Sequence, residues 1–307
     1  MKQRGGKKIY KSPFFSVIIP TYNCARFLKR ALSSVISQTY QDFEIIVVDN
    51  SSTDDTQNVL ESFADQKLNV ITVNNNGIIA YSRNRGIENA RGEWIALLDS
   101  DDIWKPEKLE KVREAINHNP EVILVCHDEW HVDNGQIKKR LKYGPSTDLY
   151  ERLLFKGNCL STSAVSLRRD IALETGGFSE REHFITVEDY EYWIRLSQIG
   201  DFFFIDDVLG EWHTHGENYS STAKFHADAL IAVMKHHFDL LLRKFPNKQK
   251  QVKHGYSKAW TDAGRILQKG RMFSKANKYV IKAICLNPFQ WKAWAVLLLS
   301  CLRISNK

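Results

Sequence analysis

Hydrophobic positions in the first hundred residues of the chain form short continuous runs separated by stretches with helical spacing. Runs rich in β-branched and large apolar residues predict buried strands at 15–19, 44–48, 70–73 and 94–98. Between them, apolar residues three and four positions apart predict helices, most clearly over 25–38 and 81–90. Strand–helix alternation with continuous apolar strands is typical of a parallel sheet covered by helices on both faces. We therefore predict an α/β fold.

The pattern becomes more mixed after about residue 120 and then changes to helix alone. Further strands are predicted near 122–126, 137–141 and 164–167, and a helix near Val187. From Ala223 onward the spacing is helical throughout, and Pro246, Gly270 and Pro288 interrupt it. We expect three parts: a basic N-terminal segment (1–13), an α/β domain (14–222) and a basic helical region (223–307).

Cysteine usage and hydropathy limit the class of protein further. Five cysteines are scattered along the chain without a CxxC pair, which indicates neither a disulfide framework nor a structural zinc site. The basic start of the chain leads into no signal-peptide apolar region, and no apolar run approaches the roughly 20 residues that cross a bilayer. A reducing, cytoplasmic setting is expected.

Charge is divided unevenly between the two large parts. Residues 1–222 hold 26 Lys and Arg against 33 Asp and Glu, whereas residues 223–307 hold 17 against 3. With Trp291 and Trp294 near its end, the basic region is typical of a helix resting on an anionic membrane surface. The alternative is a solvated region packed on the α/β domain. No nucleic-acid motif accompanies the charge, so no nucleic-acid partner is expected.

Polar clusters follow three of the predicted strands. Their sequences are Pro20-Thr21-Tyr22-Asn23, Asp49-Asn50-Ser51-Ser52-Thr53-Asp54 and Asp99-Ser100-Asp101-Asp102. In open α/β sheets, ligands bind in the crevice beyond the carboxyl ends of the strands. The sequence therefore predicts a single ligand site to which all three clusters contribute.

The acidic cluster Asp99-Ser100-Asp101-Asp102 is the candidate metal site. Neighbouring carboxylates repel one another unless a cation offsets their charge, and Mg²⁺ or Mn²⁺ would do so while also holding a diphosphate. The alternative is a solvated acidic turn in which Asp102 caps the following helix.

The first two clusters are candidates for binding a nucleobase. The carboxylate of Asp49 or the amide of Asn50 can hydrogen-bond a base edge, and Tyr22 can support the ring. Pro20 and Asn23 would shape the first turn. A plain Asx turn at a strand end is the alternative for Asp49 and Asn50.

Two arginines, Arg83 and Arg85, begin the helix that follows Gly77. Either can meet a diphosphate or pair with the acidic cluster, because guanidinium groups match both partners. Solvent-facing helix arginines are the alternative, and this applies more to Arg85.

Asp189 begins a later helix and has two interpretations. Thr186 and Asp189 have capping-box spacing, which would make Asp189 a helix cap. As a carboxylate kept ionised by the helix N-terminus, Asp189 would instead be a general base. Further on, His213 and His215 lie in a polar segment that either supplies a metal ligand or forms an ordinary surface loop.

Taken together, these residues resemble family 2 inverting glycosyltransferases. PTYN, VVDNSSTDDT, SRNRGIENARGEWIALLDSDD, GGF, the Glu188-Asp189 pair and HTHGENYSS occur in that family's order and spacing over residues 14–222. The resemblance implies a GT-A fold, a Rossmann-like α/β/α sandwich with a mostly parallel sheet and here a helical extension. It also implies a nucleotide-sugar donor, a Mn²⁺ or Mg²⁺ cofactor and displacement with inversion at the anomeric carbon.

The same resemblance assigns roles to residues of this chain. Base and ribose contacts fall on Pro20, Tyr22, Asp49 and Asn50, and the metal-binding DxD falls on Asp99, Ser100 and Asp101. We expect the nucleotide sugar to contact Thr21, Asn23, Arg83 and the DxD residues as well. Metal ligands are expected at Asp101, Asp102 and His215, and the catalytic base at Asp189 with Glu188 beside it. Two departures are Asn50 and His213, where relatives often carry Asp and Arg. A UDP donor is expected, although Asn50 replaces the usual uracil-recognising Asp.

The expected function is therefore transfer of a hexose or N-acetylhexosamine from a nucleotide sugar to a hydroxyl of a glycan or lipid-linked glycan. The resemblance points to bacterial surface polysaccharide, such as lipopolysaccharide or capsule, made at the inner face of the cytoplasmic membrane. A sugar nucleotidyltransferase is the alternative enzyme, but PTYNCARF lacks the glycine-rich basic loop that a triphosphate needs. A non-catalytic glycan- or partner-binding scaffold is the third interpretation, and it would require neither the acidic cluster nor Asp189.

Overall fold

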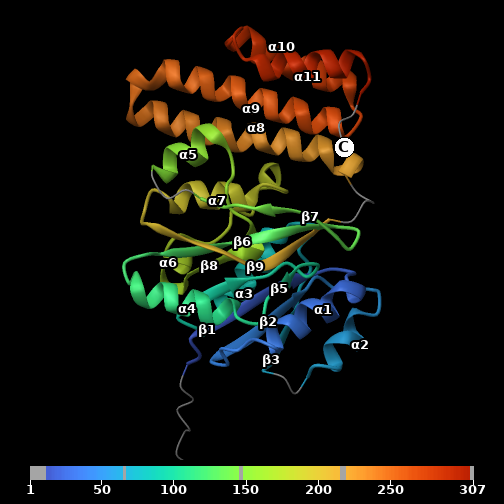
Figure 1. Ribbon diagram of the computed structural model, residues 1–307, viewed down its shortest axis with the longest axis vertical. Helices are drawn as coiled ribbons and strands as arrows, with labels where there is room; N and C mark the ends of the chain where they lie inside the picture. The colour runs from blue at the N-terminus through green and yellow to red at the C-terminus, as the bar shows by residue number, and fades with distance from the viewer. Residues whose placement is uncertain (1–11, 65–66, 145–147, 215–218, 305–307) are drawn as a thin grey trace, which may run out of the picture.

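The chain folds into an α/β body that carries a stack of helices (Figure 1). A computed structural model describes residues 12–64, 67–144, 148–214 and 219–304. The strands are β1 (Phe15–Thr21), β2 (Phe43–Asp49), β3 (Leu68–Thr72), β4 (Trp94–Leu97), β5 (Ile103–Trp104), β6 (Leu124–Asp133), β7 (Gln136–Leu141), β8 (Val165–Arg168) and β9 (Phe202–Thr214). They form one sheet in the order β3-β2-β1-β4-β8-β6-β9-β5, and β7 pairs with β6.

The first four strands form the parallel half that the sequence predicts. β1 pairs in parallel with β2 and β4, and β2 pairs in parallel with β3. Alternate side chains of β1 enter different layers: Val17 and Ile19 pack with helices α1 (Ala25–Ile36) and α4 (Lys108–His118), whereas Ile18 packs with α3 (Ile79–Asn89). Because both faces are covered, β1 and β2 are buried along their whole length, and this explains their continuous apolar sequences. A short helix, α2 (Thr56–Glu61), follows β2.

The second half of the sheet is mixed, as the less regular sequence indicates. β8 runs antiparallel to β4 and β6, while β6 and β9 are parallel. The predicted strands near 122–126, 137–141 and 164–167 correspond to β6, β7 and β8. The 13-residue strand β9 was not predicted, because the acidic pair Asp206-Asp207 interrupts its apolar pattern.

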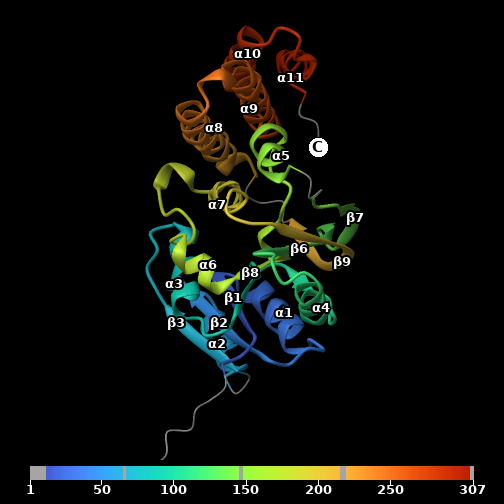
Figure 2. The same ribbon diagram turned by 90° about the vertical axis from the view of Figure 1, so that its left-hand side faces the viewer.

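The C-terminal region is helical with breaks at the predicted positions. Its helices are α8 (Tyr219–Lys244), α9 (Gln249–Lys269), α10 (Phe273–Leu286) and α11 (Trp291–Cys301). Figures 1 and 2 show α8 and α9 lying over α7 (Glu188–Leu196) and α5 (Leu149–Lys156), with α10 and α11 outermost. No helix among the described residues is long and apolar enough to cross a membrane.

The contact between α8 and the α/β body is a shared hydrophobic core. Met234 and Phe238 of α8 are buried in the same cluster as residues of β1 and β4. Phe238 also stacks on Phe155 of α5, with ring centroids 5.7 Å apart. The start of the helical region therefore packs on the α/β domain. α10 packs on α8 and α9 through a second, smaller cluster, and α10 and α11 share a third.

Candidate active site

The turns after β1 and β2 are hydrogen-bonded to each other. Asn23 accepts the Thr53 backbone N–H at 2.7 Å through its side-chain oxygen, and its own N–H donates to Ser52 Oγ at 2.9 Å. Asn23 has a φ of 46°, a left-handed conformation that Asn tolerates better than most residues. The two polar clusters thus form one surface at the carboxyl ends of the strands.

Asp49 and Asn50 differ in how much hydrogen-bonding capacity they retain. Asp49 is buried and accepts hydrogen bonds from the hydroxyl of Ser52 at 2.5 Å and from the backbone N–H of Ser52 at 3.2 Å. These bonds reach three residues along the chain, one more than in an Asx turn, and they occupy the carboxylate within the turn. The Asn50 side-chain oxygen accepts the Asn75 N–H at 2.7 Å. Because that N–H requires an oxygen acceptor, the Asn50 amide retains its NH₂ group as a donor. Tyr22 is 57% exposed beside these turns.

Asp102 is the structural member of the acidic cluster. It is 2% exposed, and its two oxygens accept hydrogen bonds from Ser163 Oγ at 2.5 Å and from the His213 backbone N–H at 2.8 Å. Ser163 also accepts the Asp99 backbone N–H at 3.0 Å, so it joins both ends of the acidic loop. Asp102 therefore fastens the end of β9 beneath the loop and does not cap the following helix. Nothing in a single sequence distinguishes Ser163 from other serines.

Asp99 and Asp101 lie nearer the surface of the same loop. The Asp99 side chain is 30% exposed. Burial, and next the charge of Asp99, raise the pKa of Asp101 to about 6. A carboxylate whose charge is disfavoured in this way is one that a hard divalent cation would stabilise, and carboxylate oxygens suit Mg²⁺ and Mn²⁺. Among the described residues, no three His, Cys, Asp or Glu side chains form a complete metal-binding group.

Arg83 connects the acidic loop to the Glu188-Asp189 pair. It is 3% exposed and donates to Asp99 Oδ1 at 2.8 Å and to Glu188 Oε1 at 2.6 Å. Burial alone would lower the pKa of this guanidinium, but the two carboxylates outweigh it and hold the pKa above its usual value. Arg85, in contrast, is partly exposed and pairs with Glu88 at 2.6 Å.

Asp189 lies in the first turn of α7 without a capping box. Thr186 has a φ of 80°, an outlier for a β-branched residue, and its hydroxyl is hydrogen-bonded to His226 Nδ1 at 3.1 Å. Asp189 Oδ1 accepts the N–H of Tyr190 at 2.7 Å. Burial, and next the charge of Glu188, raise the pKa of Asp189 to about 7. Burial therefore opposes the ionised form of Asp189 that the helix N-terminus was expected to favour.

Two cavities meet at Asp189. One of about 250 Å³ also has Asp99, Tyr143 and Trp212 in its wall, on the side of the acidic loop. The other, of about 260 Å³, lies between α5, α7, α8 and α9, and Lys258 is one of its polar residues. Asp189 thus separates a space beside the acidic loop from a space beneath the helical region.

Of the two late histidines, His213 and His215, the structure describes only His213. His213 is buried at the end of β9, and its Nε2 lies 2.9 Å from Glu211 Oε2 and 3.4 Å from an Arg30 nitrogen. The predicted metal ligand His215 lies outside the described residues.

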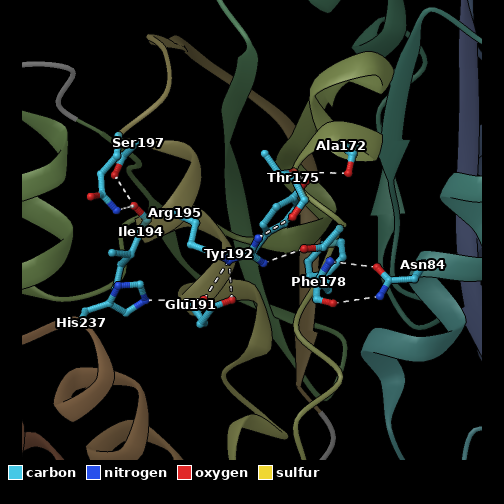
Figure 3. Close-up of polar contacts among 12 residues, drawn as sticks. Asn84, Ala172, Thr175, Phe178, Glu191, Tyr192, Ile194, Arg195, Ser197 and His237 are labelled. Atoms are coloured by element: carbon cyan, nitrogen blue, oxygen red, sulfur yellow. Dashed lines mark hydrogen bonds and ion pairs between the residues drawn. The ribbon is translucent and has the colours of Figure 1, made fainter. Parts of the chain in front are cut away.

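The position of α7 is fixed by a polar network on both sides (Figure 3). On one side, Asn84, next to Arg83, forms two 2.8 Å hydrogen bonds with the backbone of Phe178. On the other side, Arg195 donates to the Gly177 carbonyl at 2.6 Å and pairs with Glu191, which also lies 3.6 Å from His237 of α8. The network joins α3, the GGF turn, α7 and α8, and so fixes Asp189 relative to Arg83.

Gly177→Ala is expected to destabilise the fold by about 2–4 kcal/mol, because it combines left-handed strain with loss of the Asn84 contact. Gly177 has a φ of 65°, and a Cβ there would lie 2.3 Å from Asn84 Oδ1. The neighbouring Gly176 has a φ of 72° but open space around its Cβ position, so Gly176→Ala should cost only about 1 kcal/mol. Urea denaturation measures the free energy of unfolding of both variants. Equal losses of stability would contradict a contribution from the Asn84 contact.

Comparison with known proteins identifies the family to which the chain belongs. The model of the family described as "Glycosyl transferase family 2" matches residues 16–176, which include the turns after β1 and β2, the acidic loop and Arg83. The chain belongs to glycosyl transferase family 2.

Curated relatives match this chain over different lengths. An uncharacterized glycosyltransferase of Nostoc sp. is 38% identical over 166 residues, which cover 51% of this chain and 51% of that protein. The chain therefore spans about half of that relative. The putative teichuronic acid biosynthesis glycosyltransferase TuaG of Bacillus subtilis is 28% identical over 212 residues, covering 68% of this chain and 82% of TuaG.

Solved structures confirm the predicted GT-A fold with a helical region. TarS 1–349 of S. aureus in complex with UDP superimposes with a TM-score of 0.58 at 19% identity, covering 93% of this chain and 89% of that one. The mannosyltransferase PcManGT of Pyrobaculum calidifontis, in complex with GDP-Man and Mn²⁺, gives 0.59 at 18% identity, covering 95% and 87%.

Proposed function

We propose that this family 2 protein is an inverting glycosyltransferase that moves a sugar from a nucleotide-sugar donor to an acceptor hydroxyl. The observation that carries the proposal is the position of Asp189, between a cavity beside the acidic loop and a second cavity beneath the helices. A group with a pKa of about 7 in that position is matched to proton transfer near neutral pH.

The proposed donor is a UDP-sugar bound over the turns after β1 and β2. Asn50 retains its NH₂ group, which suits a carbonyl acceptor on the base, such as O4 of uracil, better than the amino group of cytosine. Tyr22 is exposed beside it and offers a ring for stacking. TarS was solved with UDP and with UDP-GlcNAc, which supports the same choice.

The proposed metal is Mn²⁺ or Mg²⁺ at the acidic loop. Asp101 is the residue best placed to hold it, because its carboxyl is partly exposed and its charge is disfavoured without a cation. Asp102 holds the loop in shape through Ser163 and His213, and His215 remains a proposed further ligand. When bound, such a metal would stabilise the negative charge of the departing nucleoside diphosphate. The Mn²⁺ in the PcManGT complex supports this cofactor.

In the proposed reaction Asp189 accepts the proton of the acceptor hydroxyl. The hydroxyl oxygen then forms a bond to the anomeric carbon as the bond to the diphosphate oxygen breaks on the opposite face, so the configuration inverts. Arg83 does not transfer a proton in this scheme. It holds Glu188 and Asp99 in place, and it keeps the charge of Glu188 compensated next to the base.

The acceptor would approach through the cavity of about 260 Å³ between α5, α7, α8 and α9. Leu154, Leu230 and Met234 give this cavity an apolar wall, while Asn158 and Lys258 supply polar groups. Mixed walls of this kind bind the apolar face and the hydroxyls of a sugar together. We propose a glycan or lipid-linked glycan acceptor of bacterial surface polysaccharide synthesis, and the similarity to TuaG supports that setting.

Calorimetry with UDP-, GDP- and dTDP-sugars is expected to show binding of a UDP-sugar that strengthens when Mn²⁺ is added. In Asp101→Asn the dependence on Mn²⁺ should fall by about tenfold or more, since a charged ligand is lost. Glu110→Gln is the matched control, because it removes the charge of an exposed carboxylate on α4. It should leave the dependence of binding on Mn²⁺ unchanged. Absence of metal-dependent binding for every nucleotide sugar would contradict the proposed function.

A further inference from the structure

The outermost helix of the C-terminal stack exposes a continuous apolar stripe. Along α11 the inward residues Ala293, Val296 and Ser300 are buried. The outward positions repeat at helical spacing and remain exposed: Trp291 at 69%, Trp294 at 50%, Leu298 at 61% and Leu302 at 60%. Phe289, in the turn that leads into α11, is 91% exposed. We call these five residues the α11 stripe.

The segment of sequence that forms α10 and α11 carries positive charge only. Between residues 263 and 307 the sequence contains nine Lys and Arg and no Asp or Glu. Lys275, Lys278 and Lys282 of α10 and Lys292 of α11 are all exposed, and Arg303 follows at the end of the helix. Large apolar side chains and cations therefore share one end of the molecule, and within α10 and α11, as far as the structure describes them, no Asp or Glu compensates the charge.

This combination determines which partner fits. A second copy of the chain would bring the same uncompensated cations against each other, so self-association through this surface is opposed by charge. A nucleic acid would satisfy the cations but would leave Leu298 and Leu302 in water. An anionic bilayer satisfies both, because tryptophan and leucine enter the interface while lysine and arginine meet the headgroups. We propose that α11 and the adjoining face of α10 dock on a membrane surface that carries anionic lipid.

The arrangement of the helices is compatible with catalysis during docking. α10 and α11 form one end of the long axis of the molecule, and β1, β2 and β3 lie toward the other end (Figures 1 and 2). α8 and α9 lie between them, and α8 is fixed to the α/β body through the shared core. A membrane on the α11 side therefore does not cover the turns of the proposed donor site.

The test is co-sedimentation of the full chain with vesicles. Vesicles of phosphatidylcholine with phosphatidylglycerol should bind the protein, and tryptophan fluorescence should shift to the blue, whereas pure phosphatidylcholine vesicles should bind at least tenfold less. Trp291→Ser combined with Leu298→Ser should lower partitioning by more than about tenfold, because two exposed apolar side chains are removed. Ile137→Ser is the matched control, since Ile137 is 60% exposed on β7, and it should bind as the wild type does.

Three outcomes would overturn the proposal. Failure of the wild type to bind anionic vesicles at low salt would do so, as would undiminished binding by the double variant. The third is a dimer in sedimentation velocity that the double variant loses, because the stripe would then be an interface between copies. Circular dichroism of the double variant separates a loss of binding from a loss of folding, and both replaced side chains are exposed, so folding is expected to persist.

Discussion

Asp189→Asn is expected to lower the rate of sugar transfer by about 10²-fold or more while donor binding persists. The amide keeps the size of the side chain and its oxygen can still accept the N–H of Tyr190, but it cannot take a proton from the acceptor. Initial rates with saturating donor, together with calorimetry of donor binding, measure the two effects separately. Asp170→Asn is the control, because Asp170 makes the same type of bond to the next backbone N–H in the first turn of α6 (Arg169–Glu174).

The raised pKa of Asp189 predicts how both the transfer rate and the stability should change with pH. Only the ionised carboxylate accepts a proton, so wild-type transfer should rise with pH through about 7. The fold favours the protonated form, whose stabilising contribution is present at low pH and is lost as pH rises through about 7. Asparagine is never charged, so Asp189→Asn should be at least as stable as the wild type at pH 8. If the inactive variant were also less stable than the wild type at pH 8, misfolding would explain the loss of activity.

Arg83→Met is expected to destabilise the protein by about 3–5 kcal/mol, because it leaves Glu188 buried without its cation. Methionine retains much of the aliphatic volume, so the loss measures charge more than packing. The ion pairs involved are short, 2.8 Å to Asp99 and 2.6 Å to Glu188, and the guanidinium also faces the ring of Phe178 at 5.3 Å. Denaturant unfolding at pH 7.5 is the measurement.

Two further variants test whether the ion pairs cause that effect. Arg85→Met removes an arginine two positions away whose side chain is 34% exposed, and such a surface pair contributes less than about 1 kcal/mol. Arg83→Met combined with Glu188→Gln should recover part of the lost stability, since the uncompensated charge is removed. If the double variant were no more stable than Arg83→Met alone, loss of packing against Phe178 would be the cause.

The strands and the candidate loops were predictable because their signals are local. The run at 15–19 is apolar at every position since β1 is buried on both faces, and Asp49 and Asp99 each follow a strand end. By contrast, β9 has polar and apolar positions that follow no simple period, because it crosses from the core to the site. Its place in the sheet depends on pairing with β6, which lies about eighty residues earlier in the sequence.

The pairing of side chains within the site could not be predicted from the sequence. Arg83 and Glu188 are separated by 105 residues, and Ser163 and Asp102 by 61. The sequence allowed Asp102 to be a helix cap and Asp189 to be part of a capping box. Only the tertiary structure brings Ser163 beneath the acidic loop and His226 next to Thr186, and so excludes both caps.

The shared core beneath α8 has a consequence for how such chains diverge and can be recombined. Phe155 and Phe238 stack across the join near residue 222, and Met234 belongs to the same core as the strands. A chimera with a crossover at that position would have to replace the face of α8 and the surface of the α/β body that packs on it together. Otherwise a large apolar face would become solvent-exposed. The helical region is therefore not an interchangeable module. If the cavity is the acceptor site that we propose, single substitutions in its wall, such as at Leu230 or Lys258, should alter acceptor preference more readily than exchange of the helices.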